Sequence, residues 1–386
     1  MRKAFVSVGA MTAIAAIAIP MTAHAQSPTV LAWGTMFNVP NVATYRTPTA
    51  ITLPEQVVQV GTSNSTEYAL LTDGTVWAWG LGSMGQLGNG TSAVVATTPV
   101  QVAFPAGVTI ASLATDAMPY NAALAIDTNG NVWGWGNNRT GALCQGGTNP
   151  QQYTTPVELP LHNVTLVAGA SGHDLFDSNG SVYACGLFQN GSLGNGKTGL
   201  SFTPTAVTGM QNQNVVALVA SSVDSGALLA NGSYYDWGAN AEDQLGVGPT
   251  PSQSNVPVLV PLRARVVQVA AGGDNTGNGS TIVRLSDGSY WGWGADSLGQ
   301  LGDAGTANRA IPVQIFPPAG ITYSLLGVAG ATSYGVTPTG AVYAWGQGSH
   351  YGIGTGSTAN AASPVEVVKG GVTQISTTAQ DVLVLG

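Results

Sequence analysis

A short apolar run that ends in an aromatic residue and a glycine recurs along this chain. Successive steps are separated by 46, 56, 50, 52, 56 and 52 residues. A period in this range is typical of a propeller, a solenoid or an array. Units of about 50 residues cannot each bury a core of their own, so they must pack on one another. The steps are Trp33-Gly34, Trp79-Gly80, Trp135-Gly136, Cys185-Gly186, Trp237-Gly238, Trp293-Gly294 and Trp345-Gly346, of which the cysteine step is a degraded copy.

Each repeat has the pattern of four short β-strands. In one repeat the strands are Val57–Val60, Tyr68–Leu71, Thr75–Trp79 and Thr98–Val102. The pair Asp73-Gly74 predicts a two-residue type I′ turn between the second and third strands, because both central residues of that turn need φ > 0. Comparable pairs occur at Asn129-Gly130, Asn179-Gly180, Asn231-Gly232, Asp287-Gly288 and Thr339-Gly340. The pattern indicates an all-β protein.

A glycine-rich loop follows the third strand of each repeat. Its copies are Gly85–Gly88, Gly141–Cys144, Gly191–Gly194, Asp243–Gly246, Gly299–Gly302 and Tyr351–Gly354. On the third strand, Trp77 and Trp79 share one face while Val76 and Ala78 share the other. We expect the bulky face of each sheet to pack on the small face of the next.

The two ends of the chain carry complementary halves of one repeat. Val372–Ser376 and Val382–Leu385 have the pattern of first and second strands, and residues 29–34 and 48–53 that of third and fourth strands. Pairing these halves hides sheet edges that an open solenoid would have to cap. The sequence therefore predicts a single domain, residues 26–386, that folds as a seven-bladed β-propeller of four-stranded antiparallel blades with 2+2 closure.

The order of these motifs resembles the regulator of chromosome condensation repeat across residues 29–386. Within that family the chain is similar to the secreted bacterial branch, which includes a secreted β-lactamase inhibitory propeller. Eukaryotic members exchange guanine nucleotides on a small GTPase and dock on nucleosomes through basic residues. This chain is acidic, and Thr66, Ala122 and Thr332 stand where many repeats place a histidine before the second strand. Nucleotide exchange is therefore not expected.

Residues 1–25 have the pattern of a secretory signal. Arg2 and Lys3 precede the uncharged stretch Ala4–Ile19, and Ala23-His24-Ala25 offers a small-x-small cleavage site. We expect cleavage after Ala25 and a secreted or periplasmic protein, with no membrane span. Cleavage changes the net charge from −8 to −10. The few remaining basic residues cannot form the positive face that nucleic acid requires.

Two cysteines, Cys144 and Cys185, fit an oxidising compartment and allow one pairing. A disulfide between them and two separate buried thiols both remain open. The sequence offers neither a metal site nor a cofactor site, because no histidine lies at ligand spacing. Asp274–Gly279 resembles the first half of a calcium loop, but position 12 would be Leu285. A surface loop is the main interpretation, with calcium as the alternative.

Catalytic motifs are scarce, and we expect no enzyme. His173-Asp174 is the one place where a base adjoins a carboxylate, and neighbouring residues on a strand point to opposite faces. No Gly-x-Ser-x-Gly, His-Glu-x-x-His or Cys-x-x-Cys motif occurs. Asp236 occupies a small-residue position of its strand and is interpreted as a buried structural acid.

The connections between first and second strands vary from repeat to repeat, and variable loops on a rigid scaffold commonly bind. We expect a monomer that presents these loops to an extracellular or periplasmic protein. An enzyme inhibitor and a carbohydrate or cell-surface adhesion module are the alternatives. An enzyme on the propeller axis would need inward-facing His, Glu or Arg from several repeats. The candidate partner-binding residues are Asp116, Tyr120, His173, Asp174, Asp224, Asp274, Asn275, Asn278 and Tyr334.

Overall fold

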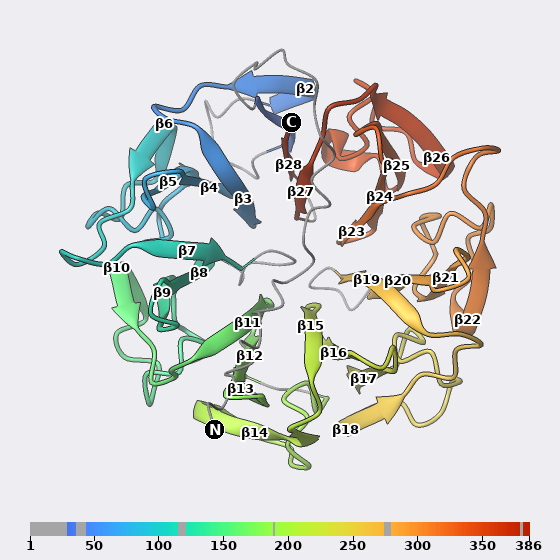
Figure 1. The fold of residues 1–386 in the computed structure, drawn as a ribbon, viewed down its shortest axis with the longest axis horizontal. Coiled ribbons are helices and arrows are strands. Elements are labelled where there is room, and N and C mark those ends of the chain that lie inside the picture. Colours follow the sequence, from blue (N-terminus) through green and yellow to red (C-terminus); the bar gives the residue numbers. More distant parts are fainter. Residues whose placement is uncertain (1–28, 36–43, 115–120, 188–189, 274–278, 379–380) are drawn as a thin grey trace, which may run out of the picture.

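The computed structural model is a closed ring of seven four-stranded antiparallel sheets (Figure 1). It describes residues 29–35, 44–114, 121–187, 190–273, 279–378 and 381–386. The predicted seven-bladed all-β propeller is confirmed. In each blade the first strand lies nearest the axis and the fourth lies at the rim, because successive strands pair through short connections.

The strand bounds follow the repeats of the sequence. The first two complete blades are β3 (Val57–Ser63), β4 (Thr66–Leu71), β5 (Val76–Leu81) and β6 (Val95–Gln101), then β7 (Ile110–Leu113), β8 (Ala122–Asp127), β9 (Val132–Asn137) and β10 (Gln152–Glu158). The next two are β11 (Val164–Gly169), β12 (His173–Ser178), β13 (Ser181–Gly186) and β14 (Ser201–Gln211), then β15 (Val215–Ala220), β16 (Asp224–Leu229), β17 (Tyr234–Ala239) and β18 (Gln253–Leu259). The last two are β19 (Val266–Gly272), β20 (Ser280–Leu285), β21 (Tyr290–Gly294) and β22 (Arg309–Ile315), then β23 (Leu325–Ala329), β24 (Thr332–Val336), β25 (Val342–Gly346) and β26 (Ala361–Val368).

The seventh blade joins the two ends of the chain. Its strands are β27 (Gln374–Thr377), β28 (Asp381–Leu385), β1 (Val30–Thr35) and β2 (Thr44–Ile51), in that order from axis to rim. Strand β1 pairs antiparallel with β28, from Val30 opposite Leu385 to Gly34 opposite Asp381. The expected 2+2 closure is therefore present.

The turns between second and third strands differ from the prediction in most blades. Gly74 N–H donates to Leu71 O (3.0 Å), Leu71 N–H donates to Thr75 O (2.9 Å), and of the turn residues only Gly74 has positive φ (+79°). This is a three-residue loop, a type I turn closed by a left-handed glycine, rather than a type I′ turn. The predicted two-residue type occurs between β12 and β13, where Asn179 and Gly180 both have positive φ (52° and 73°).

The blades are held together by a contact that we call the tryptophan latch. At four junctions the Trp of an aromatic-glycine step lies on the last glycine of the preceding blade's glycine loop, and its Nε1–H donates to a carbonyl oxygen of that loop. Trp345 lies on Gly302 in the same way but without this hydrogen bond. Trp135 donates to Gln86 O (2.9 Å), and a Cβ built on Gly88 would lie 2.8 Å from the Trp135 ring. Trp237, Trp293 and Trp33 make the equivalent bonds to Ser192 O, Gln244 O and Gly352 O (2.8, 2.9 and 2.9 Å). Only glycine fits so close beneath the ring.

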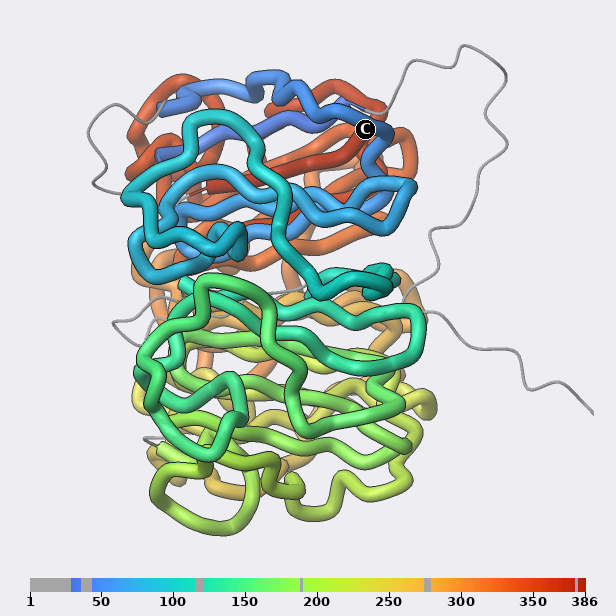
Figure 2. Tube along the Cα trace, turned by 90° about the vertical axis from the view of Figure 1, so that its left-hand side faces the viewer, coloured from blue at the N-terminus to red at the C-terminus, as the bar shows by residue number. Residues whose placement is uncertain are grey.

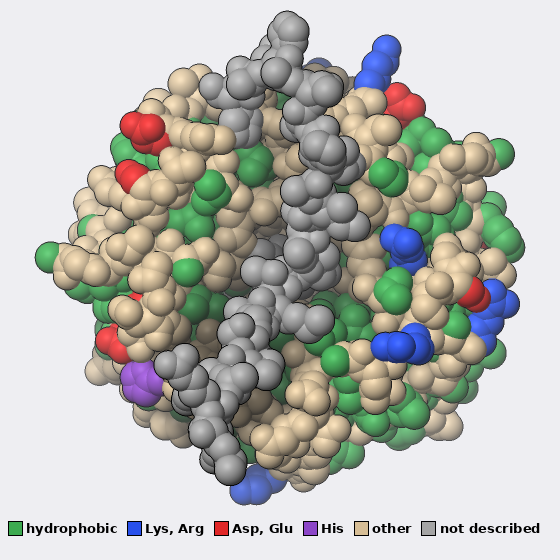
Figure 3. Space-filling model, in the orientation of Figure 1, with side chains coloured by type: hydrophobic (Ala, Val, Ile, Leu, Met, Phe, Trp, Pro, Cys, Tyr) green, Lys and Arg blue, Asp and Glu red, His purple; other side chains and the backbone are tan. Residues whose placement is uncertain are grey.

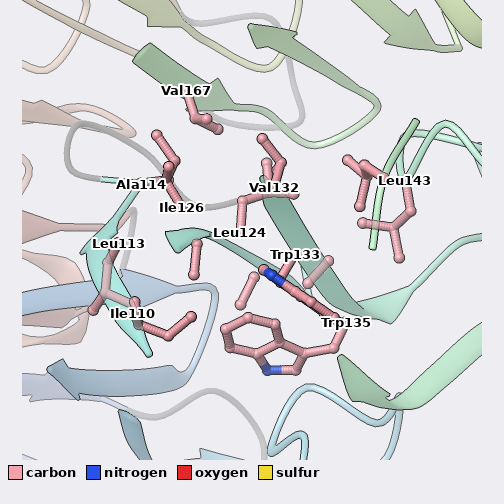
Figure 4. Packing of buried hydrophobic residues seen from close by; sticks show 14 of the residues in the cluster. Ile110, Leu113, Ala114, Leu124, Ile126, Val132, Trp133, Trp135, Leu143 and Val167 are labelled. Carbon is pink, nitrogen blue, oxygen red and sulfur yellow. The ribbon is translucent and has the colours of Figure 1, made fainter. Parts of the chain in front are cut away.

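The core therefore lies between blades as well as within them. Figure 4 shows Trp135 beside Trp133, with Leu124 and Val132 from the same blade and Val167 from the next. Trp135 is fully buried, as are Trp237 and Trp293. These tryptophans thus pack on the preceding blade rather than on the next one as predicted, and the glycine loop supplies the small-residue surface.

Candidate interaction face

Two kinds of connection emerge at the same end of the ring. Strand β4 begins at Thr66, which pairs with Gly80 at the end of β5, and Gly80 pairs with Ala96 at the start of β6. The turn between first and second strands and the glycine loop between third and fourth strands therefore adjoin in each blade. We call this end of the propeller the loop face. Figure 2 shows the ring from the side, with the strands running across its thickness between two opposite ends.

His173 does not lie in an exposed loop, contrary to the expectation. It is the first residue of β12 and is 1% exposed, because its register opposite Gly186 places the side chain between two blades. Its Nε2 lies 2.7 Å from Ser225 Oγ in the next blade. The Ser225 hydroxyl donates to Ser192 O (2.9 Å), so His173 Nε2–H is the donor to Ser225.

This geometry does not support catalysis by His173. Burial lowers the pKa of His173 to about 4, so the imidazole is neutral at pH 7. A nucleophilic serine needs its proton directed at the base, whereas the Ser225 proton is directed at a backbone carbonyl. The pair acts as a polar bridge between the second strands of two blades.

Asp174 and Asp224 are also buried at the starts of second strands, rather than exposed. Asp174 follows His173 in β12 and is fully buried, and burial raises its pKa well above the usual range. Asp224 opens β16, is 3% exposed, and accepts a hydrogen bond from the Ser221 hydroxyl. Burial raises the pKa of Asp224 to about 7. Neither carboxyl group is presented to a partner.

Tyr334, another candidate partner-binding residue, is buried rather than exposed. It lies in β24 with 1% exposure, and its hydroxyl donates to Gly352 O (2.8 Å). The turn that precedes it is short: Ala329 pairs directly with Thr332, which draws Tyr334 into the sheet. The remaining candidates, Asp116, Tyr120, Asp274, Asn275 and Asn278, and with them the calcium alternative, lie outside the described residues.

The structure also brings together acids that the sequence analysis did not combine. Asp236 is fully buried as interpreted, and it accepts hydrogen bonds from Trp237 N–H (3.0 Å) and the Tyr234 hydroxyl (3.4 Å). Burial, and then the charge of Asp224, raise the pKa of Asp236 well above its usual range. The sequence signal for this buried pair was the position of Asp236 among the small residues of a third strand.

A second acidic pair spans the closure of the ring. Glu67 in β4 and Asp381 in β28 are 1% and 3% exposed. Burial, and then the charge of Asp381, raise the pKa of Glu67 well above its usual range, and burial raises the pKa of Asp381 to about 7. Only the closed ring brings these residues together, because they are at opposite ends of the chain.

Among the described residues, the outer segments of the glycine loops are exposed on the loop face. Val94 and Leu200, which immediately precede β6 and β14, are 65% and 54% exposed. They are flanked by exposed polar residues such as Thr91 and Thr198. Figure 3 shows the opposite end of the ring, where the chain end at Gly386 lies and charged side chains are scattered among other types. Exposed apolar side chains flanked by polar residues suit a protein interface better than an ionic ligand.

The two cysteines are joined in a disulfide between Cys144 and Cys185. Cys144 ends the glycine loop between β9 and β10, and Cys185 stands in β13 at the position of the tryptophan. Both are buried, with 1% and 0% exposure. Among the residues that the structure describes, no group of three or more His, Cys, Asp or Glu is arranged to hold a metal ion. Within the same residues, no helix is long and apolar enough to cross a membrane.

Three segments of the chain match a known repeat family. Residues 73–115, 179–229 and 231–277 match the model described as "Regulator of chromosome condensation (RCC1) repeat". These three segments of the chain are thus similar to this repeat. The chain is 26% identical over 321 residues to the E3 ubiquitin-protein ligase HERC2 of Homo sapiens, covering 81% of this chain but 6% of HERC2. It is 27% identical to the ultraviolet-B receptor UVR8 of Arabidopsis thaliana, covering 81% of this chain and 70% of UVR8.

Solved structures agree on the fold. Yeast RCC1 (Prp20), in a crystal structure with Kap60, superposes with a TM-score of 0.79 at 20% identity, covering 94% of this chain and 89% of that one. This similarity supports the fold alone. These RCC1-like relatives suggest a binding or regulatory propeller.

Proposed function

We propose that this RCC1-repeat propeller is an exported, non-enzymatic binding protein that presents its loop face to a protein partner. The proposal rests on a contrast at the loop face between buried polar groups that are hydrogen-bonded within the protein and large side chains that are apolar and exposed to solvent. His173 and Ser225 are committed to each other and to a backbone carbonyl. Val94 and Leu200 are exposed to solvent.

Relatives support a protein as the partner class. Yeast Prp20 has been crystallised bound to Kap60, and its binding to Gsp1p and histones has been described. Those partners are specific to that protein. The acidic composition of this chain, with ten Lys and Arg against eighteen Asp and Glu, argues against phosphate-rich partners.

Export is proposed from the amino-terminal residues. Arg2 and Lys3, the apolar stretch Ala4–Ile19 and the small-x-small sequence before Gln26 have the order of a secretory signal. Amino-terminal sequencing of the protein isolated from its producer would test this. A first residue of Gln26 supports export, and retention of Met1 contradicts it.

An extracellular enzyme inhibitor is one specific form of this function, by resemblance to the β-lactamase inhibitory propeller. Carbohydrate adhesion is the second candidate. It would require exposed aromatic platforms, and among the described residues the exposed large hydrophobic side chains are aliphatic apart from Phe316.

The test is co-purification with surface variants. Val94→Asp and Leu200→Asp each place a charge on the loop face, and Phe316→Asp does the same at the opposite end, where Phe316 follows β22 and is 69% exposed. A partner captured from the extracellular fraction should be lost with the first two variants and retained with the third. Retention with both loop-face variants, or loss with Phe316→Asp alone, would refute the assignment of the face. A glycan array and a β-lactamase inhibition assay then separate the two specific forms.

A further inference from the structure

At one described junction a cysteine stands in place of the tryptophan of the latch. In the glycine loops, the residue beneath the ring is a glycine with positive φ, as at Gly88, Gly194 and Gly246 (64°, 63° and 64°). In the blade β7–β10 this residue is Cys144, which keeps the left-handed conformation with φ 57°. In the next blade the latch tryptophan is replaced by Cys185.

The cysteines occupy both halves of the latch, and they meet across the same junction. Cys144 N–H donates to Gly141 O (3.1 Å), as Gly88 N–H donates to Gly85 O (2.9 Å). Cys185 Sγ lies 3.6 Å from Ala142 O, the carbonyl that corresponds to the acceptor of Trp135 Nε1–H, Gln86 O. The backbone frame of the latch is therefore unchanged while its contact is replaced by a covalent bond.

We propose that the Cys144–Cys185 disulfide is a covalent substitute for the tryptophan latch, so that the stability of this one junction depends on oxidation. A tryptophan ring buries 150–250 Å² of surface, and two thiols cannot replace that contact. Phe176, which packs in the same buried cluster as both sulfurs, restores part of the volume but donates no hydrogen bond. The reduced protein would therefore carry a weakened seam between β7–β10 and β11–β14.

The chemistry is a two-electron exchange. A dithiol reductant gives two electrons and two protons to the disulfide, the Sγ–Sγ bond breaks to give two thiols, and the reductant becomes its own disulfide. Because both cysteines are buried, reduction requires the junction to open. The bond should therefore resist reductant in the folded protein and be controlled by the compartment in which the chain folds.

The test compares four samples of the full chain by calorimetry: wild type, wild type refolded in reductant, Cys144→Ala/Cys185→Ala, and Cys144→Gly/Cys185→Trp, which rebuilds the latch. The disulfide closes a loop of 41 residues. Loss of that cross-link should lower the melting temperature by about 5 °C for a chain of this size. The reduced wild type and the alanine variant should both show this shift, and the rebuilt latch should recover part of it and be insensitive to reductant.

Hydrogen exchange keeps the proposal testable if the rebuilt latch does not fold. In the reduced wild type, amides of β11 and β12 should exchange at least tenfold faster than in the oxidised protein, while those of β19 and β20 are unchanged. A melting temperature unaffected by reduction, with both thiols verified by titration, would overturn the proposal. Uniformly faster exchange around the ring would also overturn it, since the disulfide would then not act at this junction.

Discussion

Replacing Asp381 by Asn should remove one defined part of the sensitivity of this propeller to alkaline pH. Asp381 is buried where β28 meets β1, near Glu67 of the next blade, and burial raises its pKa from 3.8 to about 7. Between these values the unfolded chain releases the proton and the folded chain retains it. The folded state thus binds more protons, and the free energy of unfolding falls as pH rises. The stabilising contribution is complete below pH 4 and is lost as pH rises through about 7.

The size of the effect follows from the shift. A pKa change of about three units corresponds to about 4 kcal/mol. For a chain of this length that amounts to about 5 °C in melting temperature. Asp381→Asn has no proton to lose, so it should match the wild type at pH 4 and melt about 5 °C higher at pH 8. The assay is calorimetry of both proteins at intervals between these values.

Asp73→Asn is the control, because the pKa of Asp73 is lowered in the folded protein whereas that of Asp381 is raised. Asp73 lies in an exposed turn, where the Thr75 hydroxyl and N–H donate to it (2.7 and 2.9 Å) and lower its pKa. Its contribution is present above its ordinary pKa and is lost on acidification, so Asp73→Asn should leave the alkaline loss unchanged. Equal loss of melting temperature between pH 4 and pH 8 in the wild type and in Asp381→Asn would refute the reasoning.

Three further predictions concern the ring itself. Removing residues 26–54 deletes β1 and β2 and leaves an open ring, so calorimetry should show a thermal transition that is broader or at lower temperature. An unchanged sharp transition would contradict 2+2 closure as the source of cooperative unfolding. Gly88→Ala should lower the free energy of unfolding by more than about 2 kcal/mol in denaturant titration, because positive φ and contact with Trp135 both oppose a Cβ. Gly107 has φ +87° but nothing within 4 Å, so Gly107→Ala should lower the free energy of unfolding by only about 1 kcal/mol. Equal losses in the two variants would argue against the latch. Tyr334→Phe removes the hydrogen bond to Gly352 O and should lower the free energy of unfolding by about 1 kcal/mol while partner capture is unchanged. Loss of capture would show that Tyr334 contacts the partner.

The residues of the repeat were sufficient to predict most of the architecture. The aromatic-glycine period, the alternation of Trp77 and Trp79 with Val76 and Ala78, and the complementary end fragments each constrain strands locally, and they led to the correct blade number and closure. The turn type was predicted less well. Asp73-Gly74 suits a type I′ turn, but the same pair also fits a type I turn with a left-handed glycine, and the pairing of Leu71 with Thr75 selects the second.

The candidate site was predicted less well than the fold, for a reason visible in four residues. His173, Asp174, Asp224 and Tyr334 follow short polar connections, which in a sequence look like exposed loops. Their exposure depends on how far the strand extends toward the turn, and this is set by cross-strand pairing such as Ala329 with Thr332. A shift of one or two residues in that boundary moves a side chain from solvent into the space between blades.

The sequence by itself determined the elements of this protein that depend on near neighbours: strand period, turn glycines, the number of blades and the match between the two ends. Only the tertiary structure decided which side chains meet across blades, including Trp135 with Gly88, His173 with Ser225, Glu67 with Asp381, and Cys144 with Cys185. The physical reason is that local patterning fixes strands through the periodicity of the backbone. Contacts between blades depend on ring closure, which brings together residues that are up to the whole chain apart.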